Sequence, residues 1–223
     1  MNDYRRQESP SRIVTFDIET VSLTDDPQGA FNAMDGRIVC ICMIVDNAIE
    51  LTPLAIADQD ERKLLTRFWA SVTENDLLVG HNIADFDIAF IRQRSWILGV
   101  EPSFKVNLRK YTEEFIFDIM SIWTNWSYKM KGAGLDNIAR ALGIPGKSGH
   151  GSEVAELWRT GQFVKLLDYC MNDVWVAYQC FCRMNYRRTL PLQLPGIPLP
   201  AFLPGDTREL VPVQQKRPAP PGG

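Results

Sequence analysis

Two apolar, β-branched runs near the N-terminus constrain the fold of this chain most strongly. Residues 13–20 read Ile-Val-Thr-Phe-Asp-Ile-Glu-Thr, and residues 37–45 form a longer run of the same kind. Such runs are typical of strands. Asp46 and Asn47 then supply turn chemistry before a third predicted strand over residues 48–52. The sequence therefore predicts a sheet whose first three strands are antiparallel.

Helices and one more strand follow these three strands. Apolar side chains at helical spacing predict helices over residues 60–72, 86–98, 135–142 and 163 to about 187. Residues 77–79 indicate a short buried strand, whereas residues 100–130 show no clear pattern. Strands first, then alternating helices and strands, predict an α/β fold in which helices flank a mixed sheet.

The distribution of proline divides the chain into a domain and a tail. Nine of the 14 prolines lie in the last 35 residues, which excludes a helix there and predicts extended polyproline or disorder. We therefore expect an N-terminal extension over residues 1–11, one folded domain over residues 12–188 and a Pro-rich tail over residues 189–223. Short proline patterns in the tail suggest a possible protein partner.

Composition and charge narrow the class of protein. The 223 residues are 45% hydrophobic and 23% charged, as in soluble globular proteins. The chain contains no apolar run of about 18 residues and no signal peptide, which predicts a cytoplasmic protein without membrane contact. A net charge of 24 − 27 = −3 argues against a broad basic surface for duplex nucleic acid. The five cysteines are interpreted as reduced core residues.

Asp17 and Glu19 form the first of three acidic clusters. They lie two apart on an otherwise apolar strand, so their side chains share one face. Like charges this close repel, and the usual remedy is a cationic partner or a metal ion. No lysine or arginine is their neighbour in sequence. For this pair alone, a strand end that points two acids into water is the better explanation.

The second and third clusters weaken that explanation. Residues 80–87 follow a buried strand and open a helix, which places Asp85 and Asp87 at the sheet edge where α/β proteins bind ligands. An N-cap or first-turn acid is the alternative, and we prefer it for Asp85. Tyr169 and Asp173 lie four apart on one face of the last helix, a pair that alone is a very weak signal.

Taken together, these clusters resemble the three motifs of the DEDD superfamily of 3′–5′ exonucleases. The motif segments are Phe16–Thr20, Asn82–Asp87 and Tyr169–Asp173. The middle one is similar to that of the proofreading domain of family B DNA polymerases, and the whole chain resembles stand-alone exonucleases related to that domain. Tyr169, four residues before the last aspartate, indicates the tyrosine subclass, DEDDy. The resemblance covers roughly residues 12 to 185 and implies an RNase H-like fold, in agreement with the predicted elements.

The resemblance also implies roles for the acidic residues. Four carboxylates from three segments suit hard divalent cations, so Mg²⁺ or Mn²⁺ is expected, as two ions that together hydrolyse a phosphodiester. The family pattern assigns the metal ligands Asp17, Glu19, Asp87 and Asp173, all of them catalytic. Tyr169 completes the catalytic set by orienting the attacking water. A phenol with an ordinary pKa of about 10 is a positioning group and not a strong base.

Substrate contacts are assigned to Thr20, Asn82 and Phe86. The Asn82 amide would hydrogen bond the terminal nucleotide and the Phe86 ring would stack on it, although Phe86 is equally explained as a core residue. The implied function is a metal-dependent 3′–5′ exonuclease acting on single-stranded 3′ ends. DNA is favoured over RNA because the middle motif is polymerase-like.

Several alternatives stay open at this level. Asp118 is either a further acid near the site or a helix N-cap. Lys147 lies in a Gly-rich loop that lacks Walker spacing and is a candidate phosphate contact. A path for the strand, or simply a solvated charged face, is suggested by Arg92, Arg94, Lys105, Arg109, Lys110, Lys129 and Lys131. The competing functions are an RNA-processing exoribonuclease, a non-catalytic nucleic-acid-binding module and a protein that acts through its Pro-rich tail.

Overall fold

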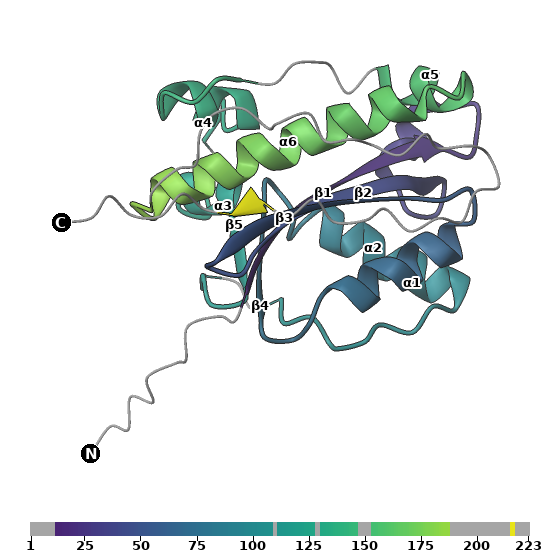
Figure 1. The fold of residues 1–223 in the computed structure, drawn as a ribbon. Helices are drawn as coiled ribbons and strands as arrows, with labels where there is room; N and C mark the ends of the chain where they lie inside the picture. Colours follow the sequence, from purple (N-terminus) through teal and green to yellow (C-terminus); the bar gives the residue numbers. More distant parts are fainter. Residues whose placement is uncertain (1–11, 109–110, 128–129, 147–152, 188–214, 217–223) are drawn as a thin grey trace.

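The computed structural model describes residues 12–108, 111–127, 130–146, 153–187 and 215–216. One sheet has helices on both faces (Figure 1). Its strands are β1 (Arg12–Ser22), β2 (Gly36–Asp46), β3 (Glu50–Ala57), β4 (Asp76–Gly80), β5 (Ile116–Asp118) and β6 (Gln215–Lys216). The helices are η1 (Pro27–Phe31), α1 (Glu61–Ser71), α2 (Asp87–Leu98), α3 (Ile119–Trp123), α4 (Leu135–Ala141), α5 (Val154–Arg159) and α6 (Phe163–Met184).

The sheet has the strand order β5-β4-β1-β2-β3-β6. β1 pairs antiparallel with β2, and β2 pairs antiparallel with β3. On its other side β1 pairs parallel with β4, and β4 pairs parallel with β5. This mixed sheet, flanked by helices and beginning with three antiparallel strands, confirms the expected RNase H-like fold class. It also makes β1 an internal strand, buried on both faces.

The third strand begins later than predicted. The Oδ1 atom of Asp46 accepts the Ala48 amide, and Oδ1 of Asn47 accepts the amides of Ile49 and Glu50. These side chains complete a turn in which Ala48 has a φ of 70°. The turn therefore occupies residues that we had assigned to the strand, which runs instead from Glu50 to Ala57.

Sequence patterns missed the shortest elements. β5 and α3 lie in the segment 100–130 that had no clear pattern, and neither η1 nor α5 was predicted. Elements of three to six residues are too short to show a helical or alternating period. The expected N-terminal extension lies outside the described residues, as does the Pro-rich tail apart from β6, which pairs with β3.

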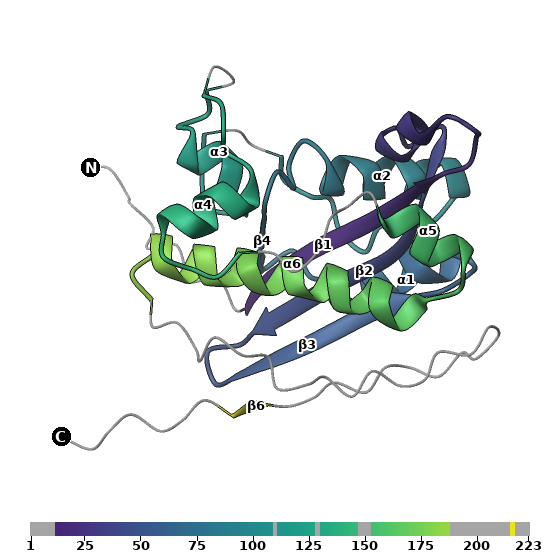
Figure 2. The same cartoon turned by 90° about the horizontal axis from the view of Figure 1, so that it is seen from above.

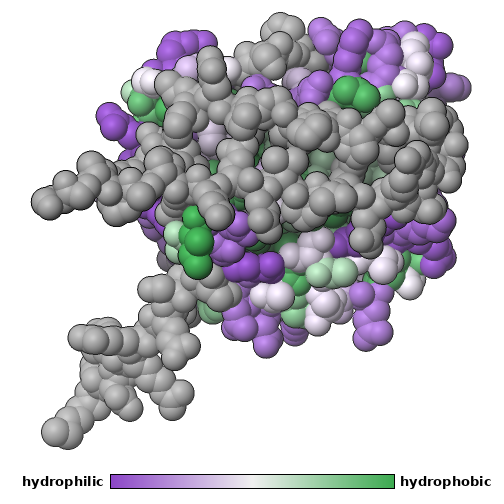
Figure 3. Space-filling model, in the orientation of Figure 1, coloured by the Kyte–Doolittle hydropathy of each residue, from purple (hydrophilic) through white to green (hydrophobic). Residues whose placement is uncertain are grey.

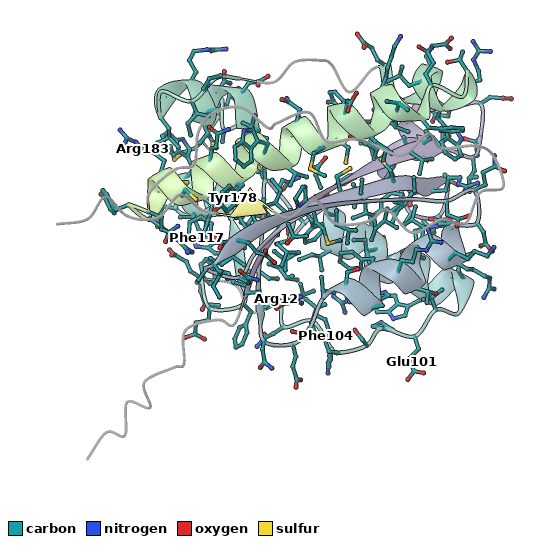
Figure 4. The ribbon with its side chains drawn as sticks, viewed as in Figure 1. Arg12, Glu101, Phe104, Phe117, Tyr178 and Arg183 are labelled. Atoms are coloured by element: carbon teal, nitrogen blue, oxygen red, sulfur yellow. The ribbon has the colours of Figure 1, made fainter. Side chains whose placement is uncertain are left out.

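The two faces of the sheet carry separate hydrophobic cores. α6 crosses one face and α1 and α2 cover the other (Figure 1). Under α6, the rings of Phe117 and Phe181 meet at 4.9 Å, and on the opposite face Trp69 meets Phe104 at 5.8 Å. Figure 4 shows Phe117 on the α6 side and Phe104 on the α1 side. Because β1 alternates, its even-numbered apolar residues pack toward α1 and α2, whereas Asp17 and Glu19 share the α6 face.

Charged and polar side chains cover much of the described surface seen in Figure 3, with apolar residues scattered among them. Within the described part of the chain, no helix is long and apolar enough to cross a membrane. The expected cytoplasmic location stays a prediction.

A buried ion pair connects α1 and α2, the two helices on the face of the sheet opposite α6. Nη2 of Arg94 on α2 lies 2.7 Å from Oε2 of Glu61 on α1, and both side chains are only 7% exposed. Oε1 of Glu61 also accepts the Arg94 Nε proton and the Ile38 amide of β2. This pair therefore ties both helices to the sheet.

Removal of Arg94 is expected to destabilise the fold strongly. Arg94→Met leaves the Glu61 carboxylate buried without its cation, so we expect a loss of about 3–5 kcal/mol in the free energy of unfolding. Urea denaturation measures this loss. The control is Arg159→Met, which breaks the exposed Arg159–Glu156 pair and is expected to cost less than about 1 kcal/mol. Equal losses of unfolding free energy in Arg94→Met and Arg159→Met would contradict a stabilising role of the buried Arg94–Glu61 pair.

Candidate active site

The first acidic pair lies where β1 passes beneath α6. Asp17 and Glu19 pair with Cys42 and Cys40 of β2, and their side chains share the α6 face. On α6, the Cys170 Sγ lies 3.5 Å from the Asp17 carbonyl oxygen and 3.9 Å from its Oδ2. A ligand atom from each of Asp17, Glu19 and Cys170 lies within 4.8 Å of the others. The two carboxylates are therefore close enough to share a cation.

Asp87 joins the second motif to β1. It is the first residue of α2, and its Oδ1 accepts the main-chain amide of Ile18 at 3.0 Å. Ile18 lies between Asp17 and Glu19, so this bond fixes Asp87 against the first pair. Asp87 is buried, and its contact with another element shows that it does more than complete the first turn of its own helix.

The loop that leads from β4 to Asp87 depends on Gly80 and Asn82. A Cβ on Gly80 would collide with the Ile83 side chain and would lie 2.8 Å from the Phe16 carbonyl oxygen, so only glycine fits there. Asn82 follows with a φ of 60°, a left-handed conformation that asparagine tolerates better than most residues. This tight path returns the chain from the end of β4 to the start of α2.

Asp118 is the N-cap of α3, which confirms one of its two predicted roles. Its Oδ1 accepts the amides of Ser121 and Asn82, and its Oδ2 accepts the amide of Ala84. Asp118 is fully buried, and its carboxylate is occupied by these three bonds. It therefore anchors the second-motif loop to α3.

Tyr169 and Asp173 bring the third motif to the same place. Burial raises the pKa of the Tyr169 hydroxyl most, and the negative charges of Asp173, Glu19 and Asp17 raise it further. A hydrogen bond with Asp173 acts in the same direction. The charges of three sequence-predicted acids therefore reach one hydroxyl, which stays protonated at neutral pH. Asp173 itself is buried.

The structure thus brings the first and third motifs to the face of β1 below α6 and bonds the second motif to the main chain of β1 beside them. Asp17, Glu19 and Asp173 act electrostatically on Tyr169, and Asp87 is bonded to the β1 backbone between the first two acids. Carboxylate oxygens suit Mg²⁺ and Mn²⁺, so the donor set fits hard divalent cations. The Cys170 thiol lies beside them, but burial raises its pKa well above the ordinary value and keeps it a neutral, poor ligand for such ions.

The predicted substrate contacts lie beside this centre. The Thr20 hydroxyl donates to the Ala30 carbonyl oxygen at 2.6 Å and so helps to hold η1 on β1. Phe86 is half-buried and meets Phe90 at 5.6 Å and Phe31 at 6.3 Å. Phe31 is 67% exposed and extends this aromatic cluster to the surface. Sequence reasoning missed Phe31 because η1 has no periodic pattern.

The structure describes some of the remaining candidate residues, which were predicted to line a path for the strand or to contact phosphate, and it corrects one of them. Arg94 is buried against Glu61, so its predicted place in a surface path for the strand is wrong. Arg92 lies over the Trp96 ring, while Lys105 and Lys131 are exposed. Outside the described residues lie Arg109, Lys110, Lys129 and Lys147. All five cysteines are buried and none of them is in a disulfide, as expected for reduced core residues.

Comparison with known proteins gives one family. A family model described as a predicted 3′–5′ exonuclease related to the exonuclease domain of PolB matches residues 32–190. The matched range includes Asp87, Tyr169 and Asp173 and begins after Asp17 and Glu19. No curated protein matches the chain.

Solved structures similar to this chain include exonuclease I. The E. coli enzyme in complex with a 5cy-dT13 oligonucleotide is 12% identical at a TM-score of 0.46, over 79% of this chain and 41% of that chain. A chain in a structure described as an ExoI/SSB-Ct complex is 12% identical at a TM-score of 0.45, over 71% of this chain and 43% of that chain. A structure of exonuclease I described as suggesting how processivity is achieved is 13% identical at a TM-score of 0.44, over 77% of this chain and 44% of that chain. This chain therefore spans less than half the length of these chains.

Loss of the Asp118 carboxylate is expected to loosen the second-motif loop. In Asp118→Asn the amide group has one acceptor oxygen, so at least one of the three amides loses its partner, at a cost of about 1–3 kcal/mol in the free energy of unfolding. Hydrogen exchange should also accelerate at Ala84 or at Asn82, whichever amide faces the new NH₂ group. The control is Asp60→Asn at the exposed N-cap of α1, where asparagine caps as well as aspartate. Unchanged exchange at both Asn82 and Ala84 would contradict the anchoring role.

Tyr169 is expected to make the metal-free protein sensitive to alkaline pH. Its folded pKa is raised, so the stability from keeping it neutral is present below the ordinary pKa of about 10 and is lost as the pH rises above that value. The free energy of unfolding should therefore fall more steeply above this pH in the wild type than in Tyr169→Phe. Tyr186→Phe, at a residue 98% exposed, should match the wild type. Parallel curves for all three proteins would refute the shift.

Proposed function

Because the chain belongs to the family of predicted 3′–5′ exonucleases related to the exonuclease domain of PolB, we propose that it removes nucleotides from the 3′ end of single-stranded nucleic acid, with DNA favoured over RNA. The observation that carries this proposal is the meeting of three distant motifs at one point of β1. The negative charges of Asp173, Glu19 and Asp17 all raise the pKa of the Tyr169 hydroxyl, and Asp87 accepts the Ile18 amide between the two acids of β1.

In this proposal Asp17, Glu19, Asp87 and Asp173 hold two Mg²⁺ or Mn²⁺ ions. Bound ions would activate water and stabilise the charge that develops on the phosphodiester oxygens. The protein supplies the carboxylates from β1, α2 and α6. That arrangement has an electrostatic cost, because like charges repel, and the cation offsets it.

Tyr169 has the role of a positioning group for the attacking water. Its pKa is raised, so the hydroxyl keeps its proton at neutral pH and can donate or accept a hydrogen bond. A neutral phenol is a poor general base at this pH, which leaves orientation as its contribution. Its position on α6, four residues before Asp173, directs both side chains to the same face.

Thr20, Asn82 and Phe86 are proposed to contact the terminal nucleotide. The half-buried Phe86 ring, continued by Phe31, offers an aromatic surface on which an unstacked base can lie. The catalytic unit in this proposal is the domain over residues 12–188, and the Pro-rich tail over residues 189–223 is a tether to a protein partner. The tail is therefore dispensable for hydrolysis of short strands.

Incubation with 5′-labelled single strands tests the activity. Single-stranded DNA should be shortened stepwise from its 3′ end in Mg²⁺ or Mn²⁺, RNA should be shortened more slowly, and EDTA should stop both reactions. Asp173→Asn removes a charged ligand from the cation site, and a loss of several kcal/mol of transition-state stabilisation corresponds to about a thousandfold fall in rate.

The matched control is Asp168→Asn, an isosteric change at an exposed aspartate on the same helix. It should leave the rate within a factor of about two. Folding of each variant is checked by thermal unfolding. A folded wild-type protein that shortens neither strand in either metal would overturn the proposed activity, and faster RNA shortening would reverse the sugar preference.

A further inference from the structure

An apolar pocket of about 270 Å³ lies beside the second-motif loop and has no role in the site described above. Ala84 and Asp85 form its wall on the loop side. The opposite wall comes from α3 and the segments around it, with Leu108, Tyr111, Met120, Thr124, Trp126 and Met130. Pockets for drug-sized ligands hold about 300–1,000 Å³, so this one suits a single planar ring better than a larger ligand.

Aromatic and apolar side chains at the mouth of this pocket are exposed to solvent. Tyr111 is 76% exposed and Met130 is 52% exposed, and Leu108 is also exposed. The Tyr111 and Trp126 rings meet edge to face, with centroids 5.4 Å apart. Isolated apolar residues are common on surfaces, but three exposed ones around one hollow are typical of a binding site. Rings with accessible faces can stack on a flat heterocycle.

The pocket is rigidly connected to the acidic centre. Asp118 accepts the amide of Ala84 in the pocket wall, and it also accepts the amide of Ser121, which lines the pocket from α3. Asp85, in the same wall, is two residues from the predicted metal ligand Asp87. One buried carboxylate therefore fixes both the pocket and the loop that presents Asp87.

The pocket lies on the opposite side of this loop from two of the predicted terminal-nucleotide contacts, Thr20 and Phe86. Thr20 and Phe86 face η1, whereas the pocket is formed with α3, which follows the β5 edge of the sheet. Figure 2 shows α3 and α4 at one end of the molecule and the purple segment that contains η1 at the other, with the loop between them. A strand whose 3′ nucleotide lies at Phe86 would therefore reach the pocket with an upstream nucleotide.

Charge in the sequence around the pocket favours a polyanionic ligand. Arg109 and Lys110 directly precede Tyr111, and Lys129 and Lys131 flank Met130. Lys131 is exposed. At the mouth of the pocket, the exposed Lys131 beside Met130 supplies a cation for phosphate neutralisation, and the Tyr111 and Trp126 rings supply base stacking, the combination that single-stranded nucleic acid requires.

We propose that this pocket binds one unstacked nucleobase upstream of the 3′-terminal nucleotide, held against Tyr111 and Trp126. The inference rests on the proposed function for the direction of the strand. It gives the protein a second base contact. This contact fixes the position of the bound strand, so that its terminal phosphodiester lies at the carboxylates. Stacking tolerates any base, so the contact adds affinity without sequence preference.

A scan with abasic nucleotides tests the pocket without relying on catalysis. Fluorescence anisotropy in EDTA measures the binding of the full chain to labelled DNA strands, each with one abasic position among the first six from the 3′ end. One position upstream of the terminus should weaken binding by about 5- to 150-fold, which is the range of one base stacked on an aromatic side chain.

Variants identify the pocket as the source of that effect. Trp126→Ala and Tyr111→Ala should weaken binding of the intact strand by a similar factor, and the same abasic position should then have no further effect. The control is Trp96→Ala, which removes an exposed tryptophan on α2 away from the pocket and should bind like the wild type. Thermal unfolding confirms that each variant is folded, and the scan on the wild type stands if one is not.

The outcomes separate this proposal from the proposed activity. A position-specific abasic effect that Trp126→Ala abolishes supports the pocket even if no strand is cleaved, in which case only the exonuclease activity fails. Stepwise cleavage with no abasic position upstream of the terminus affecting binding overturns the pocket alone. Two results together would also overturn it. A peptide of residues 189–223 binds and Trp126→Ala weakens that binding, while Trp126→Ala leaves the abasic scan unchanged. These results would assign the pocket to the Pro-rich tail.

Discussion

Repulsion between carboxylates is the constraint that organises this molecule. Asp17, Glu19 and Asp173 are all close enough to raise the pKa of one tyrosine, and such a cluster opposes folding unless the surrounding structure holds it. The internal position of β1 provides that support. β1 is paired on both sides and packed on both faces, so its two acids have little freedom to move apart.

Two buried carboxylates extend this support to the second motif, and each does so by accepting main-chain amides. Asp87 accepts the Ile18 amide, and Asp118 accepts amides from the loop and from α3. Hydrogen bonds from amides to a charged group are stronger than neutral ones and have defined geometry. The acidic cluster is thus positioned by other acids, whose charge is satisfied by the backbone.

Sequence alone predicted the long elements and the acids but not what surrounds them. Alternation located β1 and β2, and helical spacing located α1, α2, α4 and α6, because each element is long enough to show a period. Asp17, Glu19, Asp87, Tyr169 and Asp173 were identified by motif, and the structure brings them together. Phe31, Tyr111 and Trp126 had no such signal, since they lie in short or irregular segments whose placement depends on contacts distant in sequence. The same limit explains the error for Arg94, because a basic residue in a predicted helix does not reveal a buried partner 33 residues away.

The burial of every cysteine has a practical consequence. Cys40, Cys42 and Cys170 lie together beside Asp17, and burial raises the pKa of each of these thiols well above its ordinary value. Burial also raises the pKa of Cys180 to about 12. Thiol-directed dyes react with exposed thiolates, so the five natural cysteines of the folded protein should be labelled very little. A single cysteine introduced on the surface would therefore carry a fluorophore selectively, and the motion of a strand across this protein could be followed without removing any natural residue from its core.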